Sequence, residues 1–445
     1  MKSSSLFASS LAGALIALIT YLYYGFSVNR TVTVMGVMRK PGNTHIQQEV
    51  VYIADTTHCE DLHYHAPSNT LFTACEDNAA TRFSWFPPLA VFDDPELAAK
   101  SQGSIHVIDP NTKKSRRLVF ENFEDPFSTH GIDVIPDRER PDGEAVYIFA
   151  VNHTPNPERP PDNVVGKKGE WRKARSQIEV FHHVIGSPSI RHIRSIWHPL
   201  IRTPNDIFAS TATSIFVTND HHYTEGLMRA VEDMYHGAKW TEVVHIQLDP
   251  SVLTGSSSAA NGDPMAGVKV TIVIPGMHNC NGMGHGRSAG EVLVVSCTSG
   301  TLHIGELSSD PAEARPIKLV GSVQFDSLID NPNYFSDPFA SSSLRDHSGF
   351  VLPGLTRAIE LENQKQDPSA KIAVMVWLAK PSISQNGKVS WEKRLLFEDD
   401  GSRISSTSAA VILPIDPEQE GGQRRAWLYA TGFLSGNMIA VKVDL

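Results

Sequence analysis

The chain of 445 residues carries 49 acidic and 39 basic side chains, which give a formal net charge of −10 at pH 7. This acidic balance argues against a nucleic-acid partner, because phosphate binding requires a basic surface. With 41% apolar and 20% charged residues, the composition excludes a disordered chain. The length suits two or three ordinary domains or one large all-β domain.

The first segment of the chain predicts a membrane anchor. No charged residue lies between Leu6 and Phe26, and this run is close to the roughly 20 residues that a helix needs to cross a bilayer. Tyrosines cluster at its end, where the aromatic belt of a membrane helix lies. We therefore expect residues 1–27 to form an uncleaved transmembrane signal anchor, with a cleaved signal peptide as the alternative, and residues 28–45 to form a linker.

After this segment, the sequence predicts short β-strands. Apolar or alternating runs rich in β-branched and aromatic residues recur, bounded by Gly, Pro, Asn, Asp or Ser. The clearest runs begin at Val51, Thr70, Ser104, Ala145, Gln177, Ser214, Glu291, Lys371 and Ala426. Helical periodicity is scarce, and the best candidate helix extends from Leu227 to Trp240.

Several of these strands form a repeated unit. A strand ends in a small or polar residue and a turn leads into a second strand, as in EVLVVSC-TSG-TLHIGEL from Glu291 and WLYATG-FLSG-NMIAVKV from Trp427. Such repetition is typical of a β-propeller. About 400 residues at four strands per blade suit six blades, with seven blades or a pair of β-sandwiches as alternatives. We therefore expect residues 46–445 to form an all-β, six-bladed β-propeller.

Pairs of polar residues lie at the ends of predicted strands or in tight turns over most of the chain. These pairs are Glu60-Asp61, Asn205-Asp206, Asn219-Asp220, Asn281-Gly282 and Asp330-Asn331. Each pair alone is an ordinary turn signal. In a propeller, however, turns far apart in sequence converge on one axis, and a shell of carboxylate and amide oxygens favours calcium over zinc. The sequence therefore predicts a central calcium site.

Two histidines and one serine are candidates for chemistry. His130 lies in STHGID and His153 ends the run AVYIFAVNH, although each could serve a structural role. The string from Gly286 to Gly290 matches G-x-S-x-G. A glycine-rich loop precedes its serine and a strand follows it, so we interpret the string as a turn and not as a nucleophile elbow.

Cysteines and glycosylation tripeptides bear on the compartment. The four cysteines are Cys59, Cys75, Cys280 and Cys297. They permit two disulfides in an oxidising compartment, and buried free thiols are equally compatible with the sequence. Two N-x-S/T tripeptides, at Asn29 and Asn152, are the basis for expecting a glycoprotein. The first lies close to the expected membrane segment, and the second contains His153.

Taken together, these motifs resemble the animal serum paraoxonase/arylesterase family. The matching segments are CEDLHYH at Cys59, THGID at Thr129, VYIFAVNH at Val146, PNDIFA at Pro204, FVTNDHHY at Phe216, CNGMG at Cys280 and LIDN at Leu328. They follow the family's order and spacing over roughly residues 51–337. The family consists of six-bladed calcium propellers that hydrolyse lactones and esters, so the resemblance implies this fold and this activity.

The resemblance implies two calcium ions. The ligands of the catalytic ion would be Glu60, Asn205, Asn281, Asp330 and Asn331. The ligands of the structural ion would be Asp61, the backbone carbonyl of Ile132, and Asp206. Without the ions, these buried carboxylates would be unpaired, so calcium is expected to support folding as well as the reaction rate.

His130 and His153 match the family's proposed histidine pair. The resemblance implies a water that attacks a calcium-polarised carbonyl, with His130 as the base and His153 orienting it or relaying the proton. The chain departs from the family in two ways. No cysteine follows Cys297, so the family's disulfide between the first and last strands is missing. The ring of the propeller must therefore be closed by strand pairing or by other cysteine pairs. The segment from Asn333 also replaces the family's His-Pro-Asn-Gly segment, so substrate preferences are not carried over.

Two other functions stay open from the sequence. One is a related calcium propeller enzyme of the gluconolactonase or strictosidine-synthase-like type. The other is a membrane-anchored propeller that binds a partner without catalysis. The expected partners are a small lactone or ester and, through the N-terminal segment, a membrane, with no obligate protein partner. We expect the propeller in the secretory lumen or outside the cell, either anchored or secreted after signal cleavage.

Overall fold

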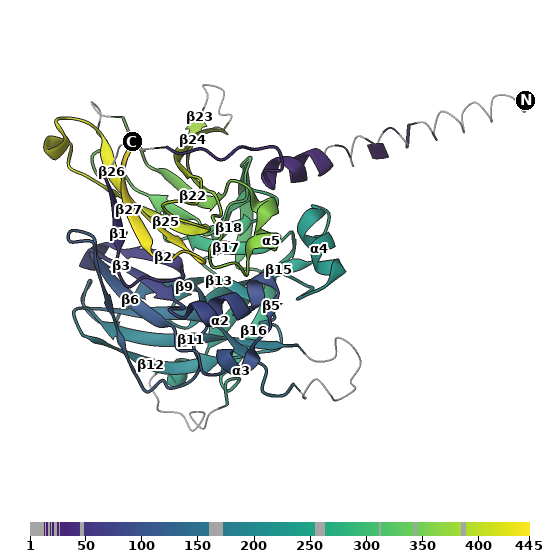
Figure 1. The fold of residues 1–445 in the computed structure, drawn as a ribbon. Helices are drawn as coiled ribbons and strands as arrows, with labels where there is room; N and C mark the ends of the chain where they lie inside the picture. Colours follow the sequence, from purple (N-terminus) through teal and green to yellow (C-terminus); the bar gives the residue numbers. More distant parts are fainter. Residues whose placement is uncertain are drawn as a thin grey trace, which may run out of the picture.

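The computed structural model describes residues 27–44, 49–159, 172–253, 263–310, 313–341, 345–383 and 389–445, and single positions between residues 13 and 25. Within these residues, the strands form six sheets of four or five strands and one two-stranded sheet. The six sheets are arranged around a common centre (Figure 1). The predicted six-bladed β-propeller is therefore confirmed.

Each blade is built mainly from antiparallel strands, in order from the innermost strand outward. The first blade contains β2 (Cys59–His65), β3 (Thr70–Cys75), β6 (Ser104–Asp109) and β7 (Lys114–Arg117). The second blade contains β9 (Thr129–Pro136), β10 (Ala145–Pro155), β11 (Ala174–Val184), β12 (Ser189–Ile196) and β8 (Val119–Glu121). The pairing of β8 with β12 is parallel. The third blade contains β13 (Pro204–Thr211), β14 (Ser214–Asn219), β15 (Thr241–Leu248) and β16 (Val268–Met277). The fourth blade contains β17 (Cys280–His285), β18 (Glu291–Ser296), β19 (Thr301–Leu307) and β20 (Ile317–Gln324). The fifth blade contains β21 (Asn333–Phe335), β22 (Gly349–Leu355), β23 (Val374–Ile383) and β24 (Val389–Asp399). The sixth blade contains β25 (Thr407–Pro414), β26 (Arg425–Gly432), β27 (Met438–Asp444) and β1 (Val50–Ile53).

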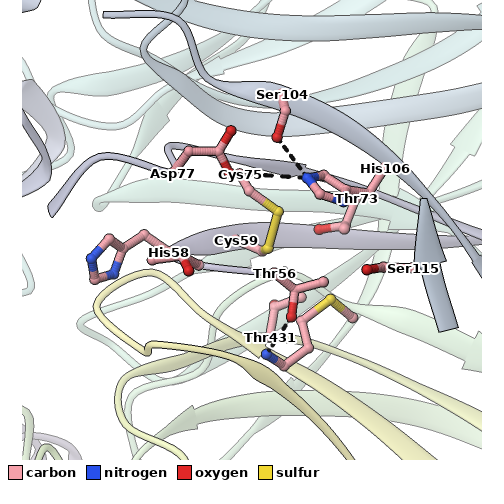
Figure 2. The surroundings of a disulfide bond; sticks show 12 residues. Thr56, His58, Cys59, Thr73, Cys75, Asp77, Ser104, His106, Ser115 and Thr431 are labelled. Atoms are coloured by element: carbon pink, nitrogen blue, oxygen red, sulfur yellow. Dashed lines mark hydrogen bonds and ion pairs between the residues drawn. A yellow bond between two sulfur atoms is a disulfide. The ribbon is translucent and has the colours of Figure 1, made fainter. Parts of the chain in front are cut away.

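Strand pairing closes the ring. β1 pairs antiparallel with β27, with Val50 opposite Val441, so the two ends of the propeller domain share the sixth blade. The innermost strands contact one another in the order β2, β9, β13, β17, β21 and β25, and β25 contacts β2 again. The disulfide of the described chain does not take part, because it joins Cys59 to Cys75 on the neighbouring strands β2 and β3 (Figure 2).

Apolar side chains fill the spaces between blades. Phe149 and Ile178 of the second blade, for example, share a buried cluster with Ile207, Val217 and Val244 of the third. Each sheet therefore packs on both faces, and the removal of apolar surface from water stabilises the ring. This explains why so many strands read as nearly continuous apolar runs in the sequence.

Helices are short and lie outside the sheets. They are α2 (Ala79–Ser84), α3 (Pro95–Ala98), α4 (Leu227–Met234) and α5 (Leu361–Gln364), with 3-10 turns at Ala66–Ser68, Pro87–Leu89, Pro250–Val252, Ala358–Glu360 and Pro417–Glu420, and the small sheet of β4 (Trp85–Phe86) and β5 (Val91–Phe92). The helix predicted from Leu227 to Trp240 ends at Met234, because Tyr235 adopts an extended conformation. Helices α4 and α5 lie on one side of the ring, near the N-terminal helical residues (Figure 1).

The segment before β1 packs against the propeller. Residues 27–34 are helical, Val34 is fully buried, and Arg30 Nη2 donates to the carbonyl oxygen of Phe325 over 2.6 Å. Most of the predicted anchor, residues 1–27, lies outside the described residues. Among the described helices, none is long and apolar enough to cross a membrane.

Candidate active site

Three predicted oxygen donors and one predicted histidine lie at equivalent positions of four inner strands. Glu60, His130, Asn205 and Asn281 are each the second residue of their strand, in β2, β9, β13 and β17 respectively. Because the inner strands surround one axis, equivalent positions face one another across it. The fifth blade contributes Asp330, which lies with Asn331 just before β21. The site is therefore assembled from residues far apart in sequence, as the propeller interpretation predicts.

A local irregularity explains why consecutive residues can both face the channel. In a regular strand, neighbouring side chains point to opposite faces of the sheet. The register shifts between Cys59 and Leu62 in β2, between Pro204 and Ile207 in β13, and between Cys280 and Met283 in β17. Such β-bulges redirect side chains and are common next to active sites. They allow Glu60-Asp61 and Asn205-Asp206 to act as pairs.

Close backbone contacts hold these strand starts together. A Cβ atom on Gly131 would lie 2.4 Å from the carbonyl oxygen of Asn205, and one on Gly282 would lie 2.6 Å from the Cα of Asn331. Glycine is therefore required at both positions. In addition, Asn331 Nδ2 donates a hydrogen bond of 3.0 Å to Glu60 Oε1, across the channel from the fifth blade to the first.

The first predicted ligand set contains buried oxygens without partners. Glu60 Oε2, Asn281 Oδ1 and Asn331 Oδ1 are buried and accept no hydrogen bond. Burial, then the charges of Asp330 and Asp61, raises the pKa of Glu60 well above its usual value. Burial and the charge of Asp61 likewise raise the pKa of Asp330. A cation among these oxygens would satisfy the acceptors and offset the repulsion, and an all-oxygen set suits calcium, so the residues fit the ion that the resemblance implies.

The second predicted ligand set is also brought together, but its oxygens have partners. Asp61 Oδ1 accepts from Leu62 N over 2.7 Å, and Asp61 Oδ2 accepts from Ile132 N over 3.0 Å. Asp206 Oδ1 and Oδ2 accept from the backbone nitrogens of Ile207 and Met283, over 2.7 and 2.6 Å. This set therefore differs from the first in its hydrogen bonding.

The two predicted histidines form a buried pair. His153 Nε2 lies 3.3 Å from His130 Nδ1, and His153 Nδ1 lies 2.8 Å from the hydroxyl of Ser176. The other ring nitrogen of His130, Nε2, lies 3.8 Å from Glu60 Oε1. Burial lowers the pKa of His153 to about 3, and burial and His153 lower the pKa of His130 well below its usual value. Both rings are therefore uncharged at neutral pH.

Residues that the sequence did not indicate surround the histidine pair. Arg82 is almost completely buried, and its guanidinium lies 4.1 Å from the centre of the Phe86 ring. Phe86 in turn meets His130 edge-on, with ring centres 5.2 Å apart. The indole nitrogen of Trp85 donates to the carbonyl oxygen of His153 over 2.7 Å. These contacts fix the two rings, and no motif marks Arg82 or its neighbours.

A cavity of about 450 Å³ lies above the first ligand set and reaches His130. Its apolar walls include Met35, Phe86, Leu328, Leu355 and Phe433, and α4 and α5 also contribute to them. Mostly apolar walls around a few polar groups are typical of small-molecule sites.

A chain of charged groups forms one polar wall of this cavity. His221 lies between two carboxylates, with Nδ1 3.0 Å from Asp220 Oδ1 and Nε2 2.7 Å from Asp233 Oδ1 on α4. Asp220 Oδ2 accepts from Asn205 Nδ2 over 3.4 Å, which orients that predicted ligand. The sequence drew attention to Asp220 as an oxygen donor but gave no role to His221 or Asp233.

Comparison with known proteins decides the family. The Arylesterase family model matches residues 94–334, more than half of the 445 residues. The chain belongs to the arylesterase family. The resemblance to the serum paraoxonase/arylesterase proteins that the sequence motifs indicated is therefore confirmed.

The curated relatives are distant. Serum paraoxonase/arylesterase 1 of Mus musculus is 27% identical over 262 residues, which are 57% of this chain and 59% of the mouse protein. Serum paraoxonase/lactonase 3 of Oryctolagus cuniculus is 24% identical over 324 residues, 72% of this chain and 74% of the rabbit protein. A solved luciferin-regenerating enzyme is 12% identical, covers 89% of this chain and 95% of its own, and has a TM-score of 0.42.

Other candidate groups in this member of the arylesterase family do not compete with the channel. Ser288 of the G-x-S-x-G string is exposed in the turn before β18, as its sequence context predicts. The thiol of Cys297 borders the cavity, but burial raises its pKa well above the usual value, so it is not a thiolate. Cys75, Asp77 and His106 lie within reach of a common metal ion, but the sulfur of Cys75 is committed to the disulfide (Figure 2).

The second glycosylation tripeptide is inaccessible. Asn152 is fully buried, and its Nδ2 donates to Pro126 O and to Glu179 Oε1, each over 2.8 Å. A glycan requires an exposed side-chain amide, so Asn152 is not available for glycosylation in the folded protein.

Proposed function

We propose that the protein is a calcium-dependent hydrolase of lactones and carboxylic esters, including aryl esters. The observation that carries the proposal is the position of three buried, unpartnered oxygens next to a pair of uncharged histidines, below a mostly apolar cavity. Calcium bound by Glu60, Asn205, Asn281, Asp330 and Asn331 would polarise the substrate carbonyl and stabilise the oxyanion of the transition state. The family relationship supports this chemistry.

The histidine pair supplies the proton transfers of this proposal. The uncharged His130 accepts a proton from a water molecule while the oxygen of that water attacks the carbonyl carbon. His153 lies 3.3 Å away and can take part of the resulting positive charge, with Ser176 Oγ 2.8 Å from its other nitrogen. When the bond between the carbonyl carbon and the ring or ester oxygen breaks, the proton is returned to that oxygen as the leaving group. No covalent enzyme intermediate is needed.

The compartment is also proposed. The disulfide between Cys59 and Cys75 supports a location in the secretory lumen or outside the cell, because disulfides persist in oxidising compartments. Attachment of the N-terminal segment to a membrane, by the uncleaved anchor, remains part of the proposal on the sequence alone.

A hydrolysis assay tests the proposed function. The full chain would be purified from a secretory host in detergent with calcium, and assayed with aliphatic lactones, aromatic lactones and phenyl acetate. We expect turnover that a calcium chelator abolishes and that added calcium restores. A protein that calcium stabilises but that turns over none of these compounds would instead support the binding propeller without catalysis.

A further inference from the structure

We infer that the protein has a second small-molecule site, at the end of the channel opposite to the candidate active site, and that this site binds a neutral aromatic compound with a hydroxyl group. A cavity of about 750 Å³ lies there, larger than the cavity of about 450 Å³ above the first ligand set. Both volumes fall in the range of about 300–1,000 Å³ that is typical of small-molecule sites. The proposed hydrolysis does not involve this second cavity, so its ligand is tested independently of the proposed function.

The ends of the inner strands place the second cavity. Five inner strands end in residues that line it, namely His65, Pro136, His285, Phe335 and Pro414 at the ends of β2, β9, β17, β21 and β25. The candidate active site lies instead at the starts of the inner strands. A strand rises about 3.3 Å per residue, so Glu60 and His65, near the start and at the end of β2, are roughly 16 Å apart. No described residue lines both cavities, so they are separate sites.

The walls of the second cavity suit a neutral ring. Aromatic side chains of three blades line it, from Tyr64 of β2, Tyr334 of β21 and Trp427 of β26. Such rings hold another ring through edge-to-face or offset-stacked contacts. The described residues that line the cavity include no Asp, Glu, Lys or Arg. An ionic ligand would therefore give up its hydration there without meeting an opposite charge.

Two histidines of the second cavity have ring nitrogens that the chain does not use. The side chain of His285 is 39% exposed, its Nε2 lies 3.0 Å from Asp133 Oδ2, and its ring centre lies 4.5 Å from that of Phe208. These contacts hold the ring, while its Nδ1 makes no hydrogen bond to a described residue. His65 Nε2 is likewise without a partner in the described part of the chain. A hydroxyl group donates to or accepts from an imidazole nitrogen, so it suits either tautomer of these rings.

Binding of para-bromophenol tests this second site. The compound is a neutral ring with one hydroxyl group, and it contains no ester or lactone bond. The full chain, purified with calcium, would be titrated with it by calorimetry at pH 7. We expect saturable binding of para-bromophenol and none of para-hydroxybenzoate, whose carboxylate meets no cationic side chain among the described walls. Failure of para-bromophenol to bind saturably would overturn the site, and equal affinities of the two compounds would overturn its preference for a neutral ligand.

Variants locate the bound phenol. Tyr64→Ala removes one wall ring, so we expect the affinity for para-bromophenol to fall roughly tenfold, as for the loss of an aromatic contact. Tyr52→Ala, at a 54% exposed tyrosine of β1 that lines neither cavity, is the matched control and should keep the affinity. If Tyr64→Ala does not fold, Trp427→Ala takes its place in the same comparison. Binding that is weakened by Phe433→Ala in the active-site cavity, and not by the second-cavity variants, would place the phenol in the active site and overturn the inference.

Discussion

Two layers of polar residues lie one behind the other in the channel, and they differ in how their charges are met. In the upper layer, Glu60 Oε2, Asn281 Oδ1 and Asn331 Oδ1 have no partner. In the lower layer, the oxygens of Asp61 accept from backbone nitrogens and from His63. Glu60 and Asp61 are consecutive in sequence, so adjacency does not determine the role of a carboxylate. The two neighbouring carboxylates therefore differ in their hydrogen-bond partners, although both are buried.

The largest expected effect is at the upper layer. Glu60→Gln keeps the shape of the side chain but removes one of the two negative charges proposed to hold calcium. We expect kcat/KM for lactones to fall on the order of 10³-fold, comparable with the loss of a transition-state-stabilising group, together with weaker calcium binding. Lactone kinetics and calcium calorimetry on the same preparation measure both. Unchanged kinetics would remove Glu60 from the proposed site.

His130→Gln should separate the histidine pair from the ion. Loss of a general base typically lowers the rate by about 10²–10⁴-fold, so we expect kcat to fall by this amount while calcium affinity and the melting temperature are kept. The matched substitution at the other end of the channel is His285→Gln, which should leave kcat unchanged. Equal losses of kcat in the two variants would indicate a general effect on folding.

Asp61→Asn should show the opposite pattern to Glu60→Gln. It removes the charge that His63 faces at 3.0 Å, and breaking a buried ion pair by removing one partner typically costs about 3–5 kcal/mol. We expect the free energy of unfolding to fall by this amount, while the folded variant keeps its calcium at the upper layer. Chemical denaturation of Asp61→Asn and Glu60→Gln under the same conditions measures the difference. A calcium defect without a stability defect in Asp61→Asn would reverse the assignment of the two layers.

The upper layer was largely predictable from the sequence, and the lower layer was not. Glu60, Asn205 and Asn281 belong to recurring polar pairs, and a propeller brings equivalent positions to one axis, although these residues begin inner strands and were expected at strand ends or in turns. The partners of the lower layer carry no such signal, because His63 and His285 have no marked role in the sequence and only the packing of the blades brings them to Asp133, at 3.4 and 3.0 Å. The resemblance supplied the expected ligands but could not indicate which of their oxygens accept hydrogen bonds from the backbone.

The pairing of the cysteines also could not be predicted from the sequence, because it depends on the register of the strands. Cys59 and Cys280 are both the first residue of an inner strand, in β2 and β17. Cys59 lies opposite Cys75 and forms the disulfide, but Cys280 lies opposite Ser296, so Cys297 is displaced by one residue and both thiols stay free. A shift of one residue turns a side chain to the other face of the sheet. Composition alone could not separate the two cases.

The disulfide should contribute moderately to stability at the edge of the upper layer. Cys59 and Cys75 are 16 residues apart, and Cys59 immediately precedes Glu60. Closing a loop of this length contributes about 3 kcal/mol in the chain-entropy model. We expect the double variant Cys59→Ser/Cys75→Ser to lose about 2–4 kcal/mol of unfolding free energy by urea denaturation. A reducing agent should have no effect on this variant but should destabilise the unaltered chain, and an equal response of the two would exclude the disulfide as the cause.

The smallest expected effect is the pH dependence contributed by His153. Burial lowers the pKa of His153 to about 3 in the folded protein, whereas an unfolded histidine titrates near about 6.5. Below pH ~6.5 the unfolded chain therefore binds a proton that the folded protein does not. The unfolding free energy then falls by up to about 1.4 kcal/mol per pH unit as the pH falls toward the pKa of His153 in the folded protein.

His153→Gln lacks this contribution, so its unfolding free energy should depend less steeply on pH between about 6 and 4.5. Because His153 also lowers the pKa of His130, the difference between the urea-denaturation curves of the two proteins at each pH reports on the histidine pair together. The same substitution at the exposed His222 is the control, and a slope as steep in His153→Gln as in the unaltered chain would mean that His153 binds its proton equally well in the folded and unfolded states.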